Sequence, residues 1–443
     1  MAAVRLEWGG DEAGGEGNTH NGKVAQYWYS CIYMPKLFAT LFCCCLSFCL
    51  LAQNPTGTLV PPDKLEVDTS GKRDIIGVGI KLLNLHIKKK PKINGQRVYY
   101  SFIPLGTSVP GGGEALITAT NAAFVQGNDP RHTFLSNVTF SPSTNLKGEW
   151  NIPFRSNIWS PNNKWNFEGD YRITFYPQYT WGLGGNTAPS NKQLVRYTYI
   201  RFYQSALRRI ANKPYLFAGI GYNLDYHLHI RTDNDTFDLA KFTGYKYGTG
   251  NHTNSFSSGL TFNLLYDTRN NSLNPLPGWF YNIVFRANPQ FLGSQNNWYS
   301  LYVDARKYIS FDPARWNVLA FWSYLWTTMG SNSPYLDLPA ITWDANQRSG
   351  RGFYPSRYTG KTLFDFETEY RRSITRDELL GFVVFGSVNS VTEPHTSNFA
   401  YVHAAVGAGL RIKFNKHSGT NFGTDFAASK GYKAVYFSLG EAF

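Results

Sequence analysis

The sequence predicts an all-β protein, a transmembrane antiparallel β-barrel of about 16 strands preceded by a short N-terminal segment. Polar and apolar residues alternate along segments of about nine to fourteen residues, as in strands that are wet on one face and contact lipid on the other. Aromatic residues make up 16% of the chain and charged residues also only 16%, which suits such strands. No apolar run after residue 53 reaches the roughly 20 residues of a transmembrane helix, so strands must make any membrane crossing.

The N-terminal part of the chain is typical of a processed leader. Residues 1–33 are interpreted as an upstream over-read of the reading frame, with the true start at Met34. Residues 34–52 contain an early lysine, a long apolar run and a small residue at Ala52, which is the pattern of a secretory signal peptide. We therefore predict that the mature chain begins at or near Gln53.

Cysteine positions and charge limit the chemistry. All five cysteines lie before residue 53, so the predicted mature chain has no disulfide and no thiolate metal site. Lipidation at Cys49 is a less favoured alternative, because bulky Phe48 precedes it. The formal net charge of +13 is spread along the chain, except for a cluster at Lys88, Lys89, Lys90 and Lys92. In an exported chain such a cluster indicates anionic lipid headgroups or a solvated linker, and not nucleic acid.

Residues 53–95 are expected to form a short prelude to one large unit, residues 96–443. The apolar stretch 75–87 predicts a small helix or a strand segment, ended by Pro91. Beyond residue 95 the chain lacks the Pro/Gly/Ser-rich linker or composition shift that would divide it into domains.

The barrel strands are identified by their period of two. In one of the clearest, the polar residues Asn223, Asp225 and His227 alternate with apolar neighbours. An even number of strands places both ends of the barrel sequence on one side of the membrane. The predicted strands are 97–103, 113–126, 132–142, 148–159, 165–176, 193–206, 214–229, 255–268, 278–288, 297–311, 317–329, 361–373, 379–391, 399–414, 419–428 and 432–440.

The connections between these strands differ in length. Segments 179–191, 232–254 and 331–360 are long and polar, whereas 312–317, 375–378 and 429–431 are short. Long connections outside the cell and short periplasmic turns are typical of barrels in the bacterial outer membrane, which we predict as the location, with the prelude in the periplasm. A soluble β-sandwich is the alternative, and its strands are usually shorter.

One segment, Ser349 to Arg371, joins a long connection to a strand with a charged face. From Leu363 onward the residues alternate, so Asp365, Glu367 and Glu369 share one face with Arg371, and aromatic residues occupy most of the other. In a lipid-facing barrel the charged face points into the lumen.

Five stretches match one protein family in the family's own order. They are Tyr266-Asp267-Thr268-Arg269 with Asn274-Pro275 and Gly278-Trp279, then Arg351-Gly352-Phe353, Glu367-Thr368-Glu369-Tyr370-Arg371, Gly407-Ala408-Gly409-Leu410-Arg411, and Ser438-Leu439-Gly440-Glu441-Ala442-Phe443. Through them residues 97–443 resemble the bacterial surface-antigen barrels of the BamA/TamA superfamily. The resemblance implies that Arg351, Gly352 and Phe353 belong to a long sixth loop that folds inward.

Two departures from the family pattern affect this expectation. The second strand after the loop, predicted at 379–391, usually carries an acid between an aromatic residue and a glycine, and Val384 stands in its place here. We therefore expect Arg351 to pair with Glu367 or Glu369 and to lock the loop, because an unpaired buried charge costs about 3–5 kcal/mol. A solvated arginine is the alternative. The prelude is also too short for even one POTRA module, which puts the family's usual route of client delivery in doubt.

The seam between the first and last strands is the second candidate site. A closed barrel pairs these strands, and here the first is predicted to be short because prolines and a glycine follow residue 103. Glycines also lie near both ends of the last strand. We therefore predict a weak seam that can part to template a client strand. Its candidate residues are Tyr99, Tyr100, Val435, Gly440 and Phe443.

Other site patterns carry less weight. His227 and His229 share a face with Asp225, but two histidines without a third definite ligand do not predict a metal site. No G-x-S-x-G or H-E-x-x-H motif occurs after residue 52, and the glycines at 111–113 are a turn and not a phosphate loop. We predict no catalytic residues, no metal and no cofactor.

The resemblance implies a non-enzymatic outer-membrane barrel that inserts or translocates proteins. Its expected partners are outer-membrane lipids and client proteins or partner lipoproteins. The alternatives are a passive diffusion pore, a structural anchor for partner lipoproteins and, least favoured, a lipid-modifying enzyme.

Overall fold

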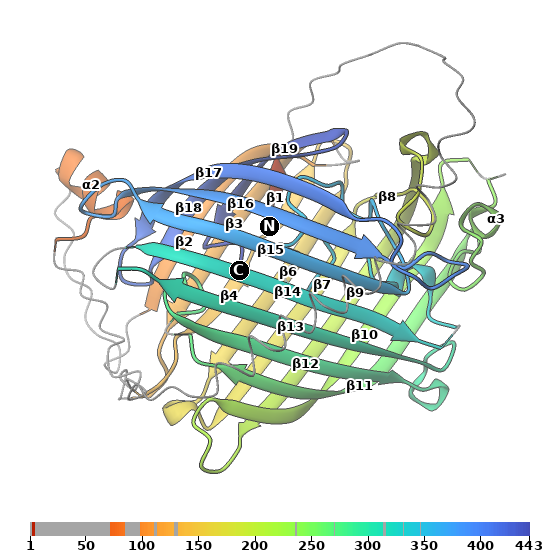
Figure 1. Cartoon of the computed structure of the whole chain (residues 1–443), viewed down its shortest axis with the longest axis horizontal. Helices are drawn as coiled ribbons and strands as arrows, with labels where there is room; N and C mark the ends of the chain where they lie inside the picture. The colour runs from red at the N-terminus through yellow and green to blue at the C-terminus, as the bar shows by residue number, and fades with distance from the viewer. Residues whose placement is uncertain are drawn as a thin grey trace, which may run out of the picture.

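A computed structural model describes residues 2–4, 71–84, 98–109, 113–127, 132–234, 237–269, 271–312, 316–330, 332–345 and 347–443. Its body is a nearly closed antiparallel barrel of 16 strands (Figure 1). This confirms the predicted fold class and strand number. In the described part of the chain, no helix is both long and apolar enough to cross a membrane. The predicted signal peptide, its cleavage site and the lysine cluster lie outside the described residues.

Two barrel strands are each interrupted once, so the 18 labelled strands from β2 to β19 form 16 barrel strands. β4 and β5 both pair with β3 and β6, and β7 and β8 both pair with β9. The strands are β2 (Val98–Val109), β3 (Gly113–Phe124), β4 (Ser136–Phe140), β5 (Ser143–Asn145), β6 (Trp150–Trp159), β7 (Trp165–Phe175), β8 (Gln178–Thr180), β9 (Gln193–Arg209), β10 (Leu216–Thr232), β11 (Thr253–Asp267), β12 (Gly278–Asn288), β13 (Trp298–Ser310), β14 (Asn317–Met329), β15 (Thr362–Ser373), β16 (Leu380–Val391), β17 (His403–Asn415), β18 (Thr420–Ser429) and β19 (Tyr432–Leu439). Most match the predicted ranges within three residues, and the short β8 was missed because it lies in a predicted loop.

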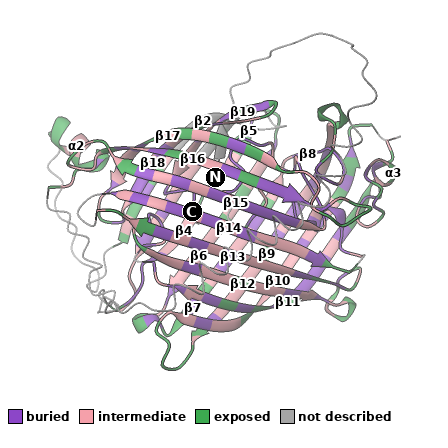
Figure 2. Ribbon diagram, in the orientation of Figure 1, coloured by how far each residue is buried: buried purple, intermediate pink, exposed green. Residues whose placement is uncertain are grey.

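The barrel has apolar residues outside and polar residues inside, as its alternation predicts. Ile220, Phe262 and Val406 are 64%, 57% and 66% exposed, whereas Asp225 and Arg411 are both 2% exposed. Alternate residues of one strand point to opposite faces of a sheet, so each strand shows alternating bands of burial (Figure 2). The outer band of exposed apolar side chains matches a surface that contacts lipid.

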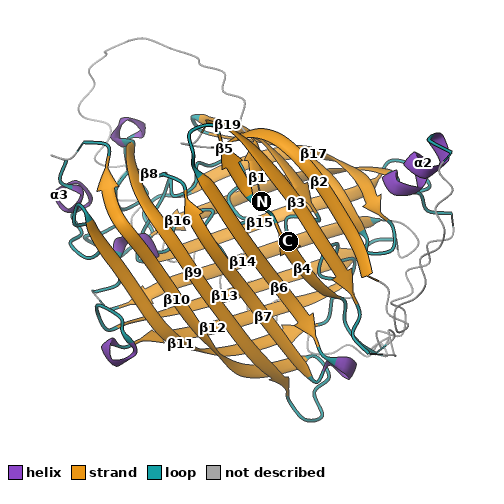
Figure 3. Cartoon of the chain, turned by 180° about the vertical axis from the view of Figure 1, so that it is seen from behind, coloured by secondary structure: helices purple, strands orange, loops and turns teal. Residues whose placement is uncertain are grey.

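Two helices mark opposite ends of the barrel (Figures 1 and 3). α2 (Ile75–Leu82) lies in the apolar stretch for which a small helix or a strand segment was predicted. Its N-cap is Asp74, whose carboxylate accepts a hydrogen bond from Gly77 N at 2.7 Å. The other Asp74 oxygen accepts from Lys416 N at 3.0 Å in the turn between β17 and β18. α2 is therefore held at the end of the short turns, and α3 (Leu239–Thr243) lies at the end of the long loops.

The segment before α2 also binds the turn between β15 and β16. Arg73 forms an ion pair with Asp377, and Lys72 Nζ lies 3.2 Å from Glu378 Oε1. Hydrogen bonding to Thr375 holds the pKa of Asp377 below its usual range, and Arg73 adds to this effect. Four short 3-10 segments also occur in the described part of the chain, at Pro161–Asn163, Pro189–Asn191, Gln290–Leu292 and Tyr335–Asp337.

The first barrel strand is longer than predicted. β2 pairs with β3 over twelve residues, from Val98 opposite Phe124 to Val109 opposite Gly113. Pro104 lies within this ladder, opposite Thr118. A proline lacks only its own N–H, and in a strand at a sheet edge that missing donor can face away from the paired neighbour. The expectation that prolines shorten the first strand was therefore wrong.

The barrel closes at the junction of its first and last strands. In the sheet order β19 is followed by β2. The outer edge of β19 pairs with β1 (Ala2–Val4). Ala2 lies opposite Phe437 and Val4 opposite Val435. β1 also lies against β2, so these three N-terminal residues occupy the junction.

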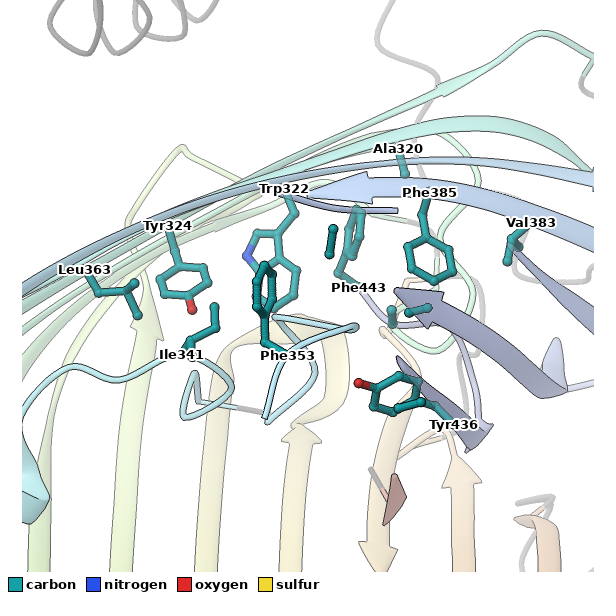
Figure 4. Packing of buried hydrophobic residues seen from close by; sticks show 14 of the residues in the cluster. Ala320, Trp322, Tyr324, Ile341, Phe353, Leu363, Val383, Phe385, Tyr436 and Phe443 are labelled. Carbon is teal, nitrogen blue, oxygen red and sulfur yellow. The ribbon is translucent and has the colours of Figure 1, made fainter. Parts of the chain in front are cut away.

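The largest buried apolar cluster lies on the inner wall of the later strands. Trp322, Phe353, Phe385, Tyr436 and Phe443 belong to it, and they come from β14, the loop before β15, β16, β19 and the segment after β19 (Figure 4). The cluster therefore packs the loop and the C-terminal segment against the same part of the wall.

Candidate functional site: the inward loop and the last strands

Arg351 lies in the loop between β14 and β15, and it is 2% exposed. Its Nη2 lies 2.6 Å from Glu369 Oε2, and its Nη1 lies 2.8 Å from Asp425 Oδ2. Glu367 is more distant, with 3.6 Å between Arg351 Nη2 and Glu367 Oε2. The guanidinium also lies 3.6 Å from the centroid of the Phe385 ring, within the range of a cation–π contact.

The carboxylates that bind Arg351 each have a second arginine. Glu369 Oε1 accepts from Arg371 Nε at 2.6 Å, and Asp425 Oδ1 accepts from Arg411 Nη1 at 2.5 Å. Arg411 in turn binds Glu441 at 2.9 Å. The result is a buried chain of three arginines and three acids. Such a chain is tolerated in a buried site because every charge is paired and hydrogen-bonded.

Backbone groups of the same loop are also bound. Gly350 N donates to Glu367 Oε1 at 2.7 Å. Glu367 therefore binds the loop backbone and is not the main partner of Arg351. Gly352 N donates to Tyr436 Oη at 2.8 Å, and Gly352 O accepts from Ser429 Oγ at 2.6 Å. The loop therefore contacts β15, β18 and β19, close to where the barrel closes.

Two glycines make this close approach possible. Gly352 has φ +96°, and a Cβ there would lie 2.9 Å from the Cβ of Ala405. At Gly409 a Cβ would lie 1.9 Å from Asp425 Oδ1, in the space that the carboxylate occupies. Larger residues would push the loop or Asp425 away from the wall.

Asp425 is the partner that the sequence analysis missed. Val384 faces outward and is 44% exposed, so it is not at the inward position that an acid paired with Arg351 would need. Phe385 takes the inward place on β16, and the acid comes from β18 instead. The alternation of β18 could have revealed it, since Asp425 shares the inward face with buried Asn421 and Ala427.

The predicted seam residues do not form one group. Tyr100 is exposed on the outer surface, whereas Tyr99 stacks on the ring of His417 at 5.4 Å. Val435 lies in β19 opposite Val4. Gly440 has φ +85° and follows the end of β19, so the chain turns inward there.

Phe443 consequently lies inside the barrel and not at the seam. Its ring centroid is 5.2 Å from that of Trp322, and its carbonyl oxygen accepts a hydrogen bond from Arg371 Nη2 at 2.8 Å. Arg348 of the long loop donates to the carbonyl oxygen of Glu441. The segment after β19 is thus bound both to the wall and to the loop.

The two histidines weighed as metal ligands are separated by a bulge. His227 is buried and stacks on Tyr199 at 4.5 Å, and its Nδ1 lies 3.7 Å from Asp337 Oδ1. His229 has φ +53° at the register shift and is exposed. Within the described residues no group of three or more His, Cys, Asp or Glu side chains is placed to hold a metal ion.

These features define an integral β-barrel of the bacterial outer membrane. The model of the Omp85 superfamily domain matches residues 137–443, more than half of the chain. The chain belongs to the Omp85 superfamily, in agreement with the BamA/TamA resemblance of its motifs. A search of the curated proteins found no match.

Several solved structures are similar to this chain at low sequence identity. CdiB from Escherichia coli has a TM-score of 0.52 at 12% identity, covering 80% of this chain and 63% of CdiB. BamA from Haemophilus ducreyi lacking POTRA domains 1–3 has a TM-score of 0.46 at 16% identity, covering 78% and 69%. CdiB from Acinetobacter baumannii has 0.48 at 10%, covering 78% and 59%. The chain thus spans less than two thirds of both CdiB chains.

Proposed function

We propose that this barrel inserts proteins into the outer membrane or translocates them across it, without enzymatic chemistry or a cofactor. The junction of β2 and β19 is the gate, and Arg351, with Gly352 and Phe353, locks the long loop beside it through Glu369, Asp425 and Glu367. The clients are proteins that present an extended strand, and partner lipoproteins are the expected accessory subunits. Membership of the Omp85 superfamily supports this class of function.

The observation that carries the proposal is the short register at the outer edge of β19. It comprises three residue pairs, all with β1, whereas β2 and β3 share twelve. No register joins β19 directly to β2 in the described strands. Each ladder hydrogen bond contributes roughly 0.5–1.5 kcal/mol, so this junction opens at lower cost than any full-length pair. This reason for a weak seam replaces the predicted shortness of the first strand.

The edge of β19 also has the chemistry to bind a strand. β1 adds to Val435–Phe437 in antiparallel register, although its sequence lies far from the barrel strands. Adding a foreign strand to a sheet edge is the β-augmentation mode of recognition, in which main-chain hydrogen bonds give affinity. A mature chain that begins at Gln53 would lack β1, which leaves this edge available to a client.

The passive-pore alternative is less well supported. Ser349, Arg351 and Phe353 are 4%, 2% and 4% exposed and pack against the inner wall. A pore gains nothing from a loop tied to the last strands by buried ion pairs that are costly to desolvate.

A reversible disulfide across the junction tests the proposal. Cysteines at Tyr100 and Val435 place one thiol on β2 and one on β19 in a predicted mature chain that has no other cysteine. With the native gene deleted, quantitative mass spectrometry of the outer membrane and the medium identifies the proteins that depend on this barrel. The reduced variant should restore them, and the oxidised variant should not.

Two matched controls use the same positions. Tyr100 lies directly opposite Ala122 on β3, and Val435 lies directly opposite Phe426 on β18. Disulfides at these two pairs join strands that are already paired, so they should leave function intact. Heat-modifiable gel migration reports whether each barrel is folded. Full activity of a folded, oxidised Tyr100/Val435 variant would exclude the gate and favour the pore or anchor alternatives.

A further inference from the structure

Four polar side chains form a square on the inner wall of β15 and β16. Asp365 lies directly opposite Asn389, and Glu367 lies directly opposite Ser387. Directly opposed residues in an antiparallel pair have Cβ atoms about 4.5–5.5 Å apart, and residues two apart on one strand share a face. All four are buried, at 0% exposure for Asp365, 1% for Asn389 and Glu367, and 6% for Ser387.

Most polar atoms of this square have no hydrogen-bond partner among the described residues. Both carboxylate oxygens of Asp365, both amide atoms of Asn389 and the hydroxyl of Ser387 make no hydrogen bond. Several other inward acids of the barrel are bound by arginine, as Asp304 is by Arg306 at 2.9 and 2.6 Å. A buried carboxylate with neither a donor nor a cation is strongly disfavoured.

The charges around the square favour a cation. Arg351 is directed to Glu369 and Asp425, and its Nη2 is 3.6 Å from Glu367 Oε2. Asp365 forms no ion pair with any residue that the structure describes. Arg351, the arginine that lies close to Glu367, is thus shared with Glu369 and Asp425.

The square also has a cover. Tyr324 lies opposite Asp365 on β14, and its hydroxyl is 2.9 Å from Ser349 Oγ in the loop. Gly350 N donates to Glu367 Oε1. The oxygens are thus enclosed between the barrel wall and the loop segment that precedes Arg351.

We propose that Asp365, Asn389 and Ser387 form a calcium-binding site, with Glu367 adding negative charge. The free donors are carboxylate, amide and hydroxyl oxygens, which suit a hard cation, and Ca²⁺ accepts irregular oxygen coordination more readily than Mg²⁺. With so few carboxylates, the dissociation constant is expected to be about 10⁻⁴–10⁻³ M, as in extracellular calcium modules. A bound Ca²⁺ is the positive partner that Asp365 lacks, and it holds β15 and β16 together beneath the loop.

Terbium luminescence tests this site in the purified full-length barrel in detergent after treatment with a chelator. Tb³⁺ takes the same oxygen ligands as Ca²⁺, and Tyr324 and Trp322, which lie opposite Asp365 and Glu367, are placed to sensitise its emission. Wild-type protein should show Tb³⁺ emission that Ca²⁺ displaces. Asp365→Asn keeps the shape of the side chain and should weaken Ca²⁺ displacement by about tenfold or more, equal to about 1.4 kcal/mol.

The matched control is Asp304→Asn, which removes an inward carboxylate that already has an arginine partner and should leave the calcium response unchanged. Heat-modifiable migration confirms that each variant is folded. If Asp365→Asn does not fold, Ser387→Ala decides the question, with an expected loss of severalfold in Ca²⁺ affinity. Wild-type protein without Ca²⁺-sensitive emission would overturn the proposal. So would unchanged affinity in the folded Asp365 or Ser387 variants, since the ion would then bind elsewhere.

Discussion

Replacing Arg351 by methionine should detach the long loop from the barrel wall without unfolding the barrel. Methionine keeps much of the side-chain volume and removes the charge. Taking one partner from a buried ion pair costs about 3–5 kcal/mol. Glu369 and Asp425 each retain a second arginine, at 2.6 and 2.5 Å. We therefore expect the lower end, about 3 kcal/mol, which is about a 150-fold increase in the detached population.

Native-state proteolysis measures this population. Chymotrypsin cleaves after aromatic residues, and Phe353 is only 4% exposed while the loop is seated. When opening and closing are fast relative to cleavage, the cleavage rate follows the population of the open form. The variant should accordingly be cut in the loop about two orders of magnitude faster. Arg269→Met is the control, because Arg269 is buried and paired with Asp267 within the barrel wall.

Double-mutant cycles identify the partners of Arg351. Coupling of about 1–3 kcal/mol is expected with Glu369→Gln and with Asp425→Asn, because these carboxylates lie 2.6 and 2.8 Å away. Coupling with Glu367→Gln should be weaker, at 3.6 Å. Unchanged cleavage in Arg351→Met, or coupling to neither Glu369 nor Asp425, would refute the lock.

The remaining predictions concern the loop backbone, α2 and the N-terminus. Gly352→Ala should also speed loop cleavage, because of the positive φ and the 2.9 Å approach to Ala405, whereas Gly386→Ala should not, since its nearest heavy atom is 3.8 Å away. Asp74→Ala removes a helix cap worth about 0.5–2 kcal/mol and should expose α2 to protease without changing barrel migration; equal cleavage would show that other contacts hold the helix. Mass spectrometry of the membrane form should find Gln53 at the N-terminus, and a start before Met34 or a lipid on Cys49 would contradict signal cleavage.

The sequence was sufficient for the barrel because strand alternation is local information. A period of two determines which residues face lipid and which face the lumen, so Asp225 and Arg411 could be placed inside before any pairing was known. The number of strands followed from the same pattern. The resemblance of Arg351-Gly352-Phe353 to the family motif pointed to the loop before β15, and its role as a lock stays a prediction.

Tertiary structure alone decided which acid meets which arginine. Asp425 lies 74 residues beyond Arg351, and its contact depends on the barrel curving β18 back toward the loop. The pairing of β19 with β1, and the inward path of Phe443, likewise join segments that no periodicity relates. Pro104 was misjudged for a related reason. A missing N–H interrupts a ladder only where the proline nitrogen faces a paired strand. The order of the strands determines which neighbour the nitrogen faces, and the residue type does not.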